Sequence, residues 1–536
     1  MRSRIYLFLS LFGFTLAPIG CSRQAPSFAN TRIAVQVFEN QSADRDLNWA
    51  GHLIAHATVR RLSIDPLLAP SVVRDAEGWR ELGSGRVLSG VLHKTAKGIA
   101  VESRLTDAMS SRVIGSYSAV VEEKELVAMT GRMIESLLSV KPGDPQGDSE
   151  AWAAFARAMD KGGVDELASV VARYPGFSTA YPLCAELLRR SGRFDEAKEL
   201  AAKLPAGADA LSKAQLAYGL AEDAKAKLLA LKSLIALRPT DVRLRGEAGL
   251  VAASLGDWPG AVDQYRELTK LEAIKPDWWN SLGYAHANLN QLPNALAALN
   301  EYRRLVPSEP NTLDSLGEVN FMNRQFKEAA RFFDEEAQKF PGFQNGVSLR
   351  KAAFAFYRAG DLKTADARFE TWLKQVFGNA PPRVLAFQRA MWMIRTGRWP
   401  QAQEFLRGEA AKSTGDLKAA LDLYLVMMRF GVEGVRPTPA NLAALQQPIH
   451  DPALRSEFSI FALLSQPVAN VAAMEARINA AVPQPQLAQL RGELLAAGRA
   501  ILSPVVATKP RVFPLPNLLD STLDALVVRS QLAVIP

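Results

Sequence analysis

The segment from Pro276 to Pro341 contains one helical pattern twice, at a spacing of 34 residues. The positions of the first copy are Trp279, Leu282, Gly283, Ala295, Leu299 and Pro307, and those of the second are Leu313, Leu316, Gly317, Ala329, Phe333 and Pro341. A glycine lets two antiparallel helices approach closely, a large side chain fills the space beside it, and proline ends the second helix. Because one such helix pair cannot bury its own apolar face, successive pairs must stack. The pattern therefore predicts an α-helical solenoid.

The 34-residue pattern resembles the tetratricopeptide repeat. Its register extends to about residues 208–343, two shorter units precede it, and the turns AGDLKTADARF and TGRWPQAQEFL continue it. We expect about eight repeats over residues 149–416. The resemblance implies a docking surface for protein or peptide partners, with no catalysis and no cofactor.

A mixture of strand and helix patterns precedes the repeats. Strands are expected at 33–38, 67–73, 86–94, 98–106 and 112–121, and helices at 47–62, 77–82 and 123–140. Residues 31–140 therefore form a small α/β domain, and residues 141–148 are a linker rich in Pro, Gly and Asp. The segments IAVQVFENQSADRDLNWAGHLIAHATVRRL and VLSGVLHKTAKGIAVESRLTDAMSSRVIGSYS resemble the TolB amino-terminal-like domain. The overall fold class is α+β, with this domain followed by the solenoid.

The first 21 residues have the pattern of an export signal, with Arg2 and Arg4 before an apolar run at 5–17. Ile-Gly-Cys at the end of this stretch resembles a bacterial lipobox, although Pro18 stands where that pattern prefers leucine. The resemblance implies lipidation of Cys21, a tether over residues 22–30, and an outer-membrane lipoprotein that faces the periplasm. The alternative is an ordinary cleaved signal and a soluble periplasmic or secreted product.

The net charge of +8 is not concentrated in one basic stripe, since residues 24–382 are neutral overall. We therefore expect no nucleic-acid partner. Cys184 is the second of two cysteines, and its place in a repeat helix predicts a core residue. Residues 417–536 are helical but interrupted by prolines, which is typical of a terminal cap; a separate partner-binding tail is the alternative.

Few residues suggest chemistry. His52 and His56 have a spacing that could share a metal on a helix, but no third ligand accompanies them, so we expect no metal site. Acidic residues follow the first strand, where α/β folds often place function, and Asp46 is expected to cap the next helix. Phosphate-binding loops, nucleophile elbows and kinase or cyclase motifs are missing from the sequence, so no catalytic residue is predicted.

The repeat resemblance implies that the second, fifth, ninth and thirteenth positions of each first helix face a groove. These positions are Asp277, Asn280, Tyr284 and Asn288 in one repeat, and Asn311, Asp314, Glu318 and Met322 in the next. Amides can pair with the backbone of an extended peptide while the ring covers an apolar side chain. An ordinary wet groove would have the same composition.

Two hypotheses of function follow. The first is a lipid-anchored envelope scaffold without enzymatic activity, which docks protein partners on its repeats. The second is a regulatory protein whose α/β domain binds a small molecule and whose repeats relay that binding to a partner. A polar cavity in the α/β domain would favour the second hypothesis.

Overall fold

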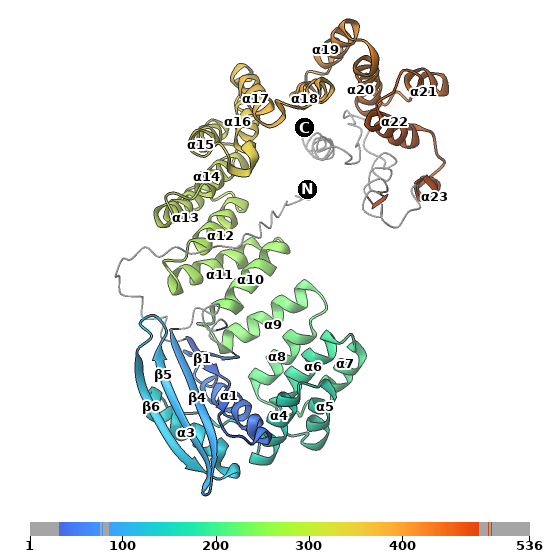
Figure 1. Ribbon diagram of the computed structural model, residues 1–536. Coiled ribbons are helices and arrows are strands. Elements are labelled where there is room, and N and C mark those ends of the chain that lie inside the picture. Colours follow the sequence, from blue (N-terminus) through green and yellow to red (C-terminus); the bar gives the residue numbers. More distant parts are fainter. Residues whose placement is uncertain (1–31, 75–77, 79–84, 482–490, 493–494, 496–536) are drawn as a thin grey trace. The chain divides into compact units, whose positions relative to one another are not determined.

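The computed structural model describes residues 32–74, 78, 85–481, 491–492 and 495 (Figure 1). The chain divides into two compact units, of which the first ends at Pro307 and the second begins at Ser308. The export signal, Cys21, the tether, the expected helix at 77–82 except residue 78, and residues 496–536 lie outside this range. The predicted fold class is confirmed, because a small sheet domain precedes a long series of helical hairpins. Within the described residues, no helix combines the length and apolar character needed to cross a membrane.

The sheet of the first unit has six strands in the order β3-β1-β4-β5-β6, with β2 paired to β4. Strand β1 pairs in parallel with β3 and β4, whereas β4, β5 and β6 form antiparallel hairpins. The strands are β1 (Arg32–Gln36), β2 (Glu39–Asn40), β3 (Ala69–Val73), β4 (Arg86–Thr95), β5 (Gly98–Asp107) and β6 (Val113–Val121). In β5, buried Val101, Ser103 and Leu105 alternate with exposed Glu102 and Arg104, so one face of this strand is buried and the other is open.

Helices α1 (Asn48–Leu62) and α3 (Leu126–Leu138) pack against each other and against the sheet. The expectation that Asp46 caps the first helix is wrong. The Asp44 side chain instead accepts a hydrogen bond from the Asp46 backbone N–H, at 3.1 Å. The reason is a short 3-10 turn over Arg45–Leu47, which moves the capping position two residues towards the N-terminus.

Five hairpins follow in the first unit, and each places a first helix against a second (Figure 1). They are α4 (Ser149–Lys161) with α5 (Val164–Arg173), α6 (Ala180–Arg190) with α7 (Phe194–Ala202), α8 (Ala210–Leu220) with α9 (Ala224–Leu237), α10 (Val242–Ser254) with α11 (Trp258–Leu271), and α12 (Pro276–Asn288) with α13 (Leu292–Leu305). Aspartates cap several first turns, as Asp148 does for α4. Cys184 is fully buried in α6, and burial raises the pKa of its thiol to about 11.

The second unit continues with the same architecture and ends in a less regular helical block. Its hairpins are α14 (Asn311–Met322) with α15 (Phe326–Lys339), α16 (Val347–Arg358) with α17 (Leu362–Phe377), and α18 (Pro382–Arg395) with α19 (Trp399–Lys412). The block comprises α20 (Gly415–Glu433), α21 (Pro439–Gln446), α22 (Pro452–Ser465) and α23 (Val471–Ala481). Its buried side chains share one apolar cluster with those of α18 and α19.

The repeated glycines lie where paired helices touch. A Cβ atom on Gly283 would lie 2.6 Å from the Leu299 side chain, and one on Gly317 would lie 2.4 Å from the Phe333 ring. A Cβ atom on Gly249 would likewise lie 2.7 Å from the Tyr265 ring. In all three hairpins the partner follows the glycine by 16 residues, so the sequence pattern corresponds to one recurring contact.

Candidate functional site

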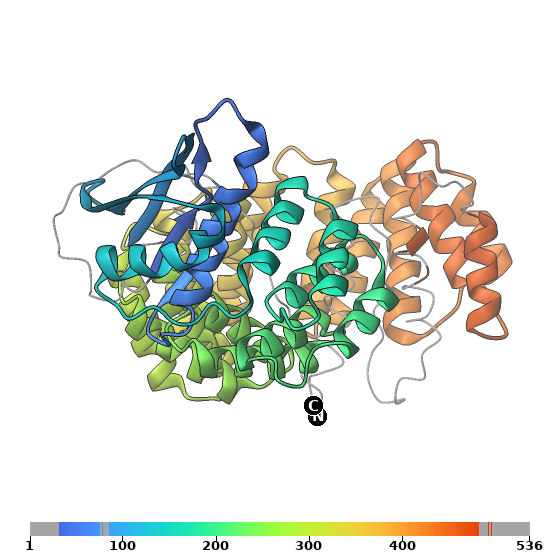
Figure 2. The same cartoon turned by 90° about the horizontal axis from the view of Figure 1, so that it is seen from below.

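The α/β domain is docked on the first hairpins of its own unit. Helix α1 packs against α4, where the Arg157 guanidinium lies 4.1 Å from the centre of the Trp49 ring. In the same interface, the His56 ring meets the edge of Phe155 at a centroid distance of 5.3 Å. The α/β domain is therefore packed against the repeats and not merely tethered to them, as two views show (Figures 1 and 2).

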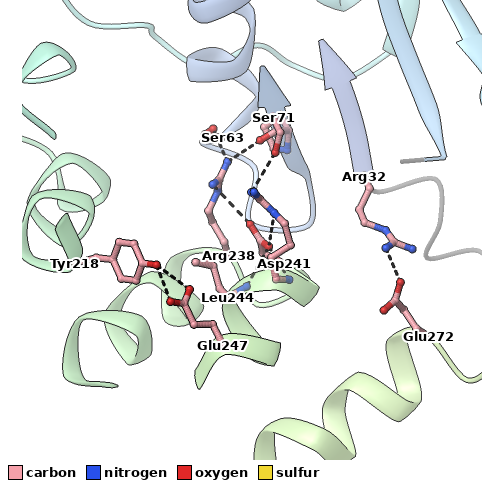
Figure 3. A network of polar contacts seen from close by, with 11 residues as sticks. Arg32, Ser63, Ser71, Tyr218, Arg238, Asp241, Leu244, Glu247 and Glu272 are labelled. Carbon is pink, nitrogen blue, oxygen red and sulfur yellow. Dashed lines mark hydrogen bonds and ion pairs between the residues drawn. The ribbon is translucent and has the colours of Figure 1, made fainter. Parts of the chain in front are cut away.

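Arginines extend this docking along the repeats. Arg238, at the end of α9, is only 7% exposed, and its Nη2 donates to Ser63 Oγ at 3.0 Å and to the Pro70 carbonyl at 3.1 Å (Figure 3). Arg32 on β1 forms an ion pair with Glu272 after α11, with 2.5 Å between Nη1 and Oε1. Since buried charges are stable only when they are paired, these contacts fix the domain on the repeats.

A further buried ion pair joins α1 to the start of α8. The Arg60 Nη2 atom lies 2.5 Å from Asp209 Oδ2, and Asp209 also caps α8 through the Ser212 N–H. Burial alone would raise the pKa of Asp209, but the hydrogen bonds from Arg60 and Ser212 hold it well below its usual range. Asp209 is therefore ionised at neutral pH and helps to hold α1 on the repeats.

The stripe predicted on α12 lies at the surface of the first unit. Asp277 is exposed, and Asn280, Tyr284 and Asn288 are half-buried. Asn288 donates to the Tyr284 carbonyl at 2.9 Å. The Oδ1 atom of Asn280 is enclosed and accepts no hydrogen bond from the described residues. A docked chain can therefore donate to this Oδ1 only after the Asn280 side chain turns outward.

The stripe predicted on α14 of the second unit is partly occupied by its own chain. Lys351 reaches from α16, and its Nζ lies 2.5 Å from Asp314 Oδ1 and 2.6 Å from Glu318 Oε1. Asn311 is half-buried, and Met322 is 42% exposed. Two of the four predicted positions thus form an internal ion cluster, with Lys351 as a member that the sequence did not suggest.

Glu336 of α15 lies under this cluster and is fully buried. Neither of its carboxyl oxygens has a hydrogen-bond partner of ordinary geometry among the described residues. Burial, and then the Asp314 charge, raise the pKa of Glu336 to about 8, although the nearby Ser348 hydroxyl and the Lys351 charge oppose this. Burial likewise raises the pKa of Asp314 to about 6 against the attraction of Lys351. Glu336 is therefore predominantly protonated at neutral pH.

A polar cavity of about 1020 Å³ lies beside the sheet of the α/β domain. Its lining includes Glu39, His52, Arg74, Glu102 and Asp160. The Nδ1 atom of His52 is enclosed without a partner among the described residues, and burial lowers the pKa of this imidazole. The His52 and His56 rings lie 6.4 Å apart, and no group of three or more potential ligands gathers anywhere in the described part of the chain.

The tetratricopeptide repeat family matches residues 247–310. No curated protein matches the chain. Among solved structures, the chain is similar to MamA (18% identity, 30% of this chain and 91% of that one, TM-score 0.26). It is also similar to a tetratricopeptide repeat protein from Parabacteroides merdae (13% identity, 52% and 98%, TM-score 0.29). A complex of Naa15 and Naa10 bound to HypK is similar over 66% of each chain, at 12% identity and a TM-score of 0.37.

Proposed function

We propose that the protein is a non-enzymatic, lipid-anchored scaffold of the bacterial envelope that docks protein or peptide partners on its repeats. Tetratricopeptide repeat proteins typically bind other proteins and are not enzymes, and this chain matches that family over two successive hairpins. The export pattern and Cys21 support attachment to the outer membrane, with the folded part in the periplasm. A mature bacterial lipoprotein carries several acyl chains, which together hold a protein stably on a membrane.

The observation that carries the docking proposal is the surface of α12. Its apolar residues, such as Leu282 and Ala285, are buried, whereas Asp277, Tyr284 and Asn288 remain accessible. The enclosed Oδ1 of Asn280 lies on the same stripe and has no donor in the described chain. If the Asn280 side chain turns outward, a backbone N–H of an extended peptide would supply that donor, while the Tyr284 ring would cover an apolar side chain.

The test begins with a partner identified by crosslinking in intact cells and then purified. We expect Asn280→Ala combined with Asn311→Ala to weaken binding of this partner at least about tenfold, measured by titration calorimetry, with an unchanged melting temperature. The matched control is Asn294→Ala, at an exposed position on the second helix of the same hairpin. Unchanged affinity of the double variant would contradict this location of the docking surface.

The lipid anchor has its own test, which does not depend on the partner. We expect the Cys21→Ser variant to leave the membrane fraction and appear in the soluble periplasmic or culture fraction. Retention of this variant in the membrane fraction would contradict anchoring through Cys21 and favour attachment by another part of the chain.

The cavity beside the sheet favours a second candidate function, a regulatory protein whose α/β domain binds a small molecule. Its volume of about 1020 Å³ and the unpartnered His52 Nδ1 suit a polar ligand. Native mass spectrometry of protein purified gently from its host should then detect a bound molecule that the His52→Phe variant lacks. An identical mass pattern for both proteins would count against this function.

A further inference from the structure

A second cavity, of about 940 Å³, lies between the docked α/β domain and the first hairpins. Helix α1 and strand β3 contribute residues on one side, and α6, α8, α9 and α10 contribute most of the others. It is distinct from the cavity beside the sheet, because no residue lines both of them. Its volume is within the range of about 300–1,000 Å³ that is typical of small-molecule sites.

Positive charge predominates around this cavity. Among the described residues, its cationic lining is Arg60, Arg189, Arg190, Lys227, Arg238 and Arg243. Three carboxylates also line it, and each already has a partner. Glu247 accepts from Tyr218 at 2.8 Å and pairs with Lys227, Glu186 pairs with Arg190, and Asp241 caps α10 and lies 3.8 Å from Arg238 (Figure 3).

Two of the arginines are more than nine-tenths buried and not fully paired. Arg60 and Arg238 are each 7% exposed, and the Nε–H of each is enclosed without an acceptor among the described residues. The Thr179 hydroxyl, which lines the same cavity, is also enclosed and has no hydrogen-bond partner in the described part of the chain. A guanidinium keeps its charge in proteins and has five N–H donors, so an unmet donor in a buried position is costly.

The arginines also repel one another. Burial lowers the pKa of Arg238, Asp241 opposes this, and the charges of Arg243 and Arg60 lower the pKa further. An anion in the cavity would offset this repulsion, and a small turn of the guanidinium groups towards it would let it accept from the remaining N–H groups. Carboxylates and phosphates match the planar geometry of guanidinium groups.

The cavity also has an apolar wall. Val59 and Val72 belong to the α/β domain, and Leu183, Leu211 and Leu244 belong to the repeats. These apolar side chains make no favourable contact with a bare inorganic ion, but they would cover the hydrocarbon or aromatic part of an organic ligand. We infer that this cavity is a binding site for a small amphipathic organic anion, which bridges the α/β domain and the repeats through Arg60 and Arg238.

The probe for a test is anilinonaphthalene sulfonate, whose fluorescence reports binding and whose structure combines an aromatic body with an anionic group. We expect saturable binding of one probe per full-length mature chain, with an affinity that falls as the salt concentration rises. The uncharged N-phenylnaphthylamine should bind at least about tenfold more weakly, because it offers the arginines no acceptor. Equal affinity for the charged and uncharged probes would overturn the proposal.

The place where the probe binds can be tested with a variant that fills the cavity and leaves its polar side chains intact. Leu244→Trp on α10 should reduce the affinity for the probe at least about tenfold. Leu250→Trp, on the same helix but with a side chain that is 58% exposed, should leave it unchanged. Equal effects of the two variants would contradict this location.

Hydrogen exchange on the unmodified full-length chain provides a second measurement that needs no variant. Saturating octanoate should slow exchange in α1, β3, α8 and α10 at least about threefold, because it joins the two sides of the cavity. Protection that is absent, or confined to helices of the second unit, would overturn the proposal even if Leu244→Trp fails to fold.

Discussion

The two compact units use their buried charges in different contacts. In the first unit, buried arginines such as Arg238 donate to oxygen atoms of the α/β domain and hold it on the repeats. In the second unit, buried carboxyl groups such as Asp314 and Glu336 gather around Lys351 within three successive helices. The same hairpin architecture therefore uses buried charge to dock a domain in one unit and to join neighbouring repeats in the other.

This difference has a chemical consequence. Arginine cannot lose its proton in a protein, so a buried guanidinium must find acceptors, as Arg238 does at Ser63 Oγ and the Pro70 carbonyl of the docked domain. A carboxyl group can become neutral by binding a proton, as Glu336 does when burial raises its pKa to about 8. We therefore expect the second unit to be sensitive to pH in a range where the contacts of Arg238 are not.

The largest effect is expected from Lys351→Met in the second unit. This change leaves Asp314 and Glu318 without their shared cation, and breaking a buried ion pair costs about 3–5 kcal/mol. Hydrogen exchange in α14–α16, measured over a series of urea concentrations, gives the loss of unfolding free energy. The control Lys363→Met, at an exposed position on α17, should change stability by less than about 0.5 kcal/mol. Similar losses for both variants would show that the cluster contributes nothing specific.

The next effect concerns the docking of the α/β domain. Arg238→Ala removes the group that donates hydrogen bonds to Ser63 Oγ and to the Pro70 carbonyl. We expect the docking of the domain to lose about 2–3 kcal/mol, which would be visible as faster hydrogen exchange in β3. Arg243→Ala removes a 3.2 Å hydrogen bond to Ser71 and a 3.8 Å ion pair with Asp241 from an exposed side chain, and less than about 1 kcal/mol should be lost. If the exposed arginine proves equally important, burial is not what makes this docking strong.

A smaller difference in stability is expected between two glycine-to-alanine variants of the second unit. Gly317→Ala would place a Cβ 2.4 Å from the buried Phe333 ring, so we expect a net loss of about 1–2 kcal/mol despite the better helix propensity of alanine. Gly408 is also helical but has no neighbour within 4 Å of a built Cβ. Gly408→Ala should therefore stabilise the protein by up to about 1 kcal/mol. Thermal unfolding compares the two variants, and stabilisation by both would refute the close helix contact.

The smallest expected effect is a dependence of the stability of the second unit on pH. The folded pKa of Glu336 is raised from 4.5 to about 8, so the stability that this group contributes is present at low pH and declines as pH rises towards 8. The corresponding decline for Asp314, with a pKa of about 6, is largely complete by pH 6.5.

Opening of α15, followed by hydrogen exchange corrected for the chemical exchange rate, should therefore become easier between about pH 6.5 and 8. Glu336→Gln imitates the protonated group and should remove most of this change. A wild-type protein with constant protection over this range would contradict the protonated state of Glu336.

Local patterns made much of the fold predictable. The 34-residue spacing predicted the contacts of Gly283 and Gly317, because each glycine and its large partner lie within one hairpin. The strands of the α/β domain were predictable from alternation and from loops of ordinary hairpin length. The groove positions were predictable only as positions on a helix, and their partners were not.

The missed contacts join residues that are far apart or out of register. Arg238 meets Ser63 across 175 residues, and no local pattern indicates that pairing. Lys351 was missed because a turn over Phe343–Gly346, with Gln344 and Asn345 at positive φ, lengthens the connection before α16. The spacing of the earlier repeats therefore does not place the side chains of α16.

We propose that partners dock on the first helices of the repeats, and photocrosslinking in intact cells tests this docking without a purified partner. A photoreactive amino acid replaces Tyr284 on α12 in one strain, Met322 on α14 in a second, and Arg304 on α13 in a third. Arg304 is exposed on the second helix of its hairpin, so it provides the matched control. We predict a discrete partner adduct from position 284, another from position 322, and none from position 304. Adducts that form equally from position 304, or form only there, would contradict the claim.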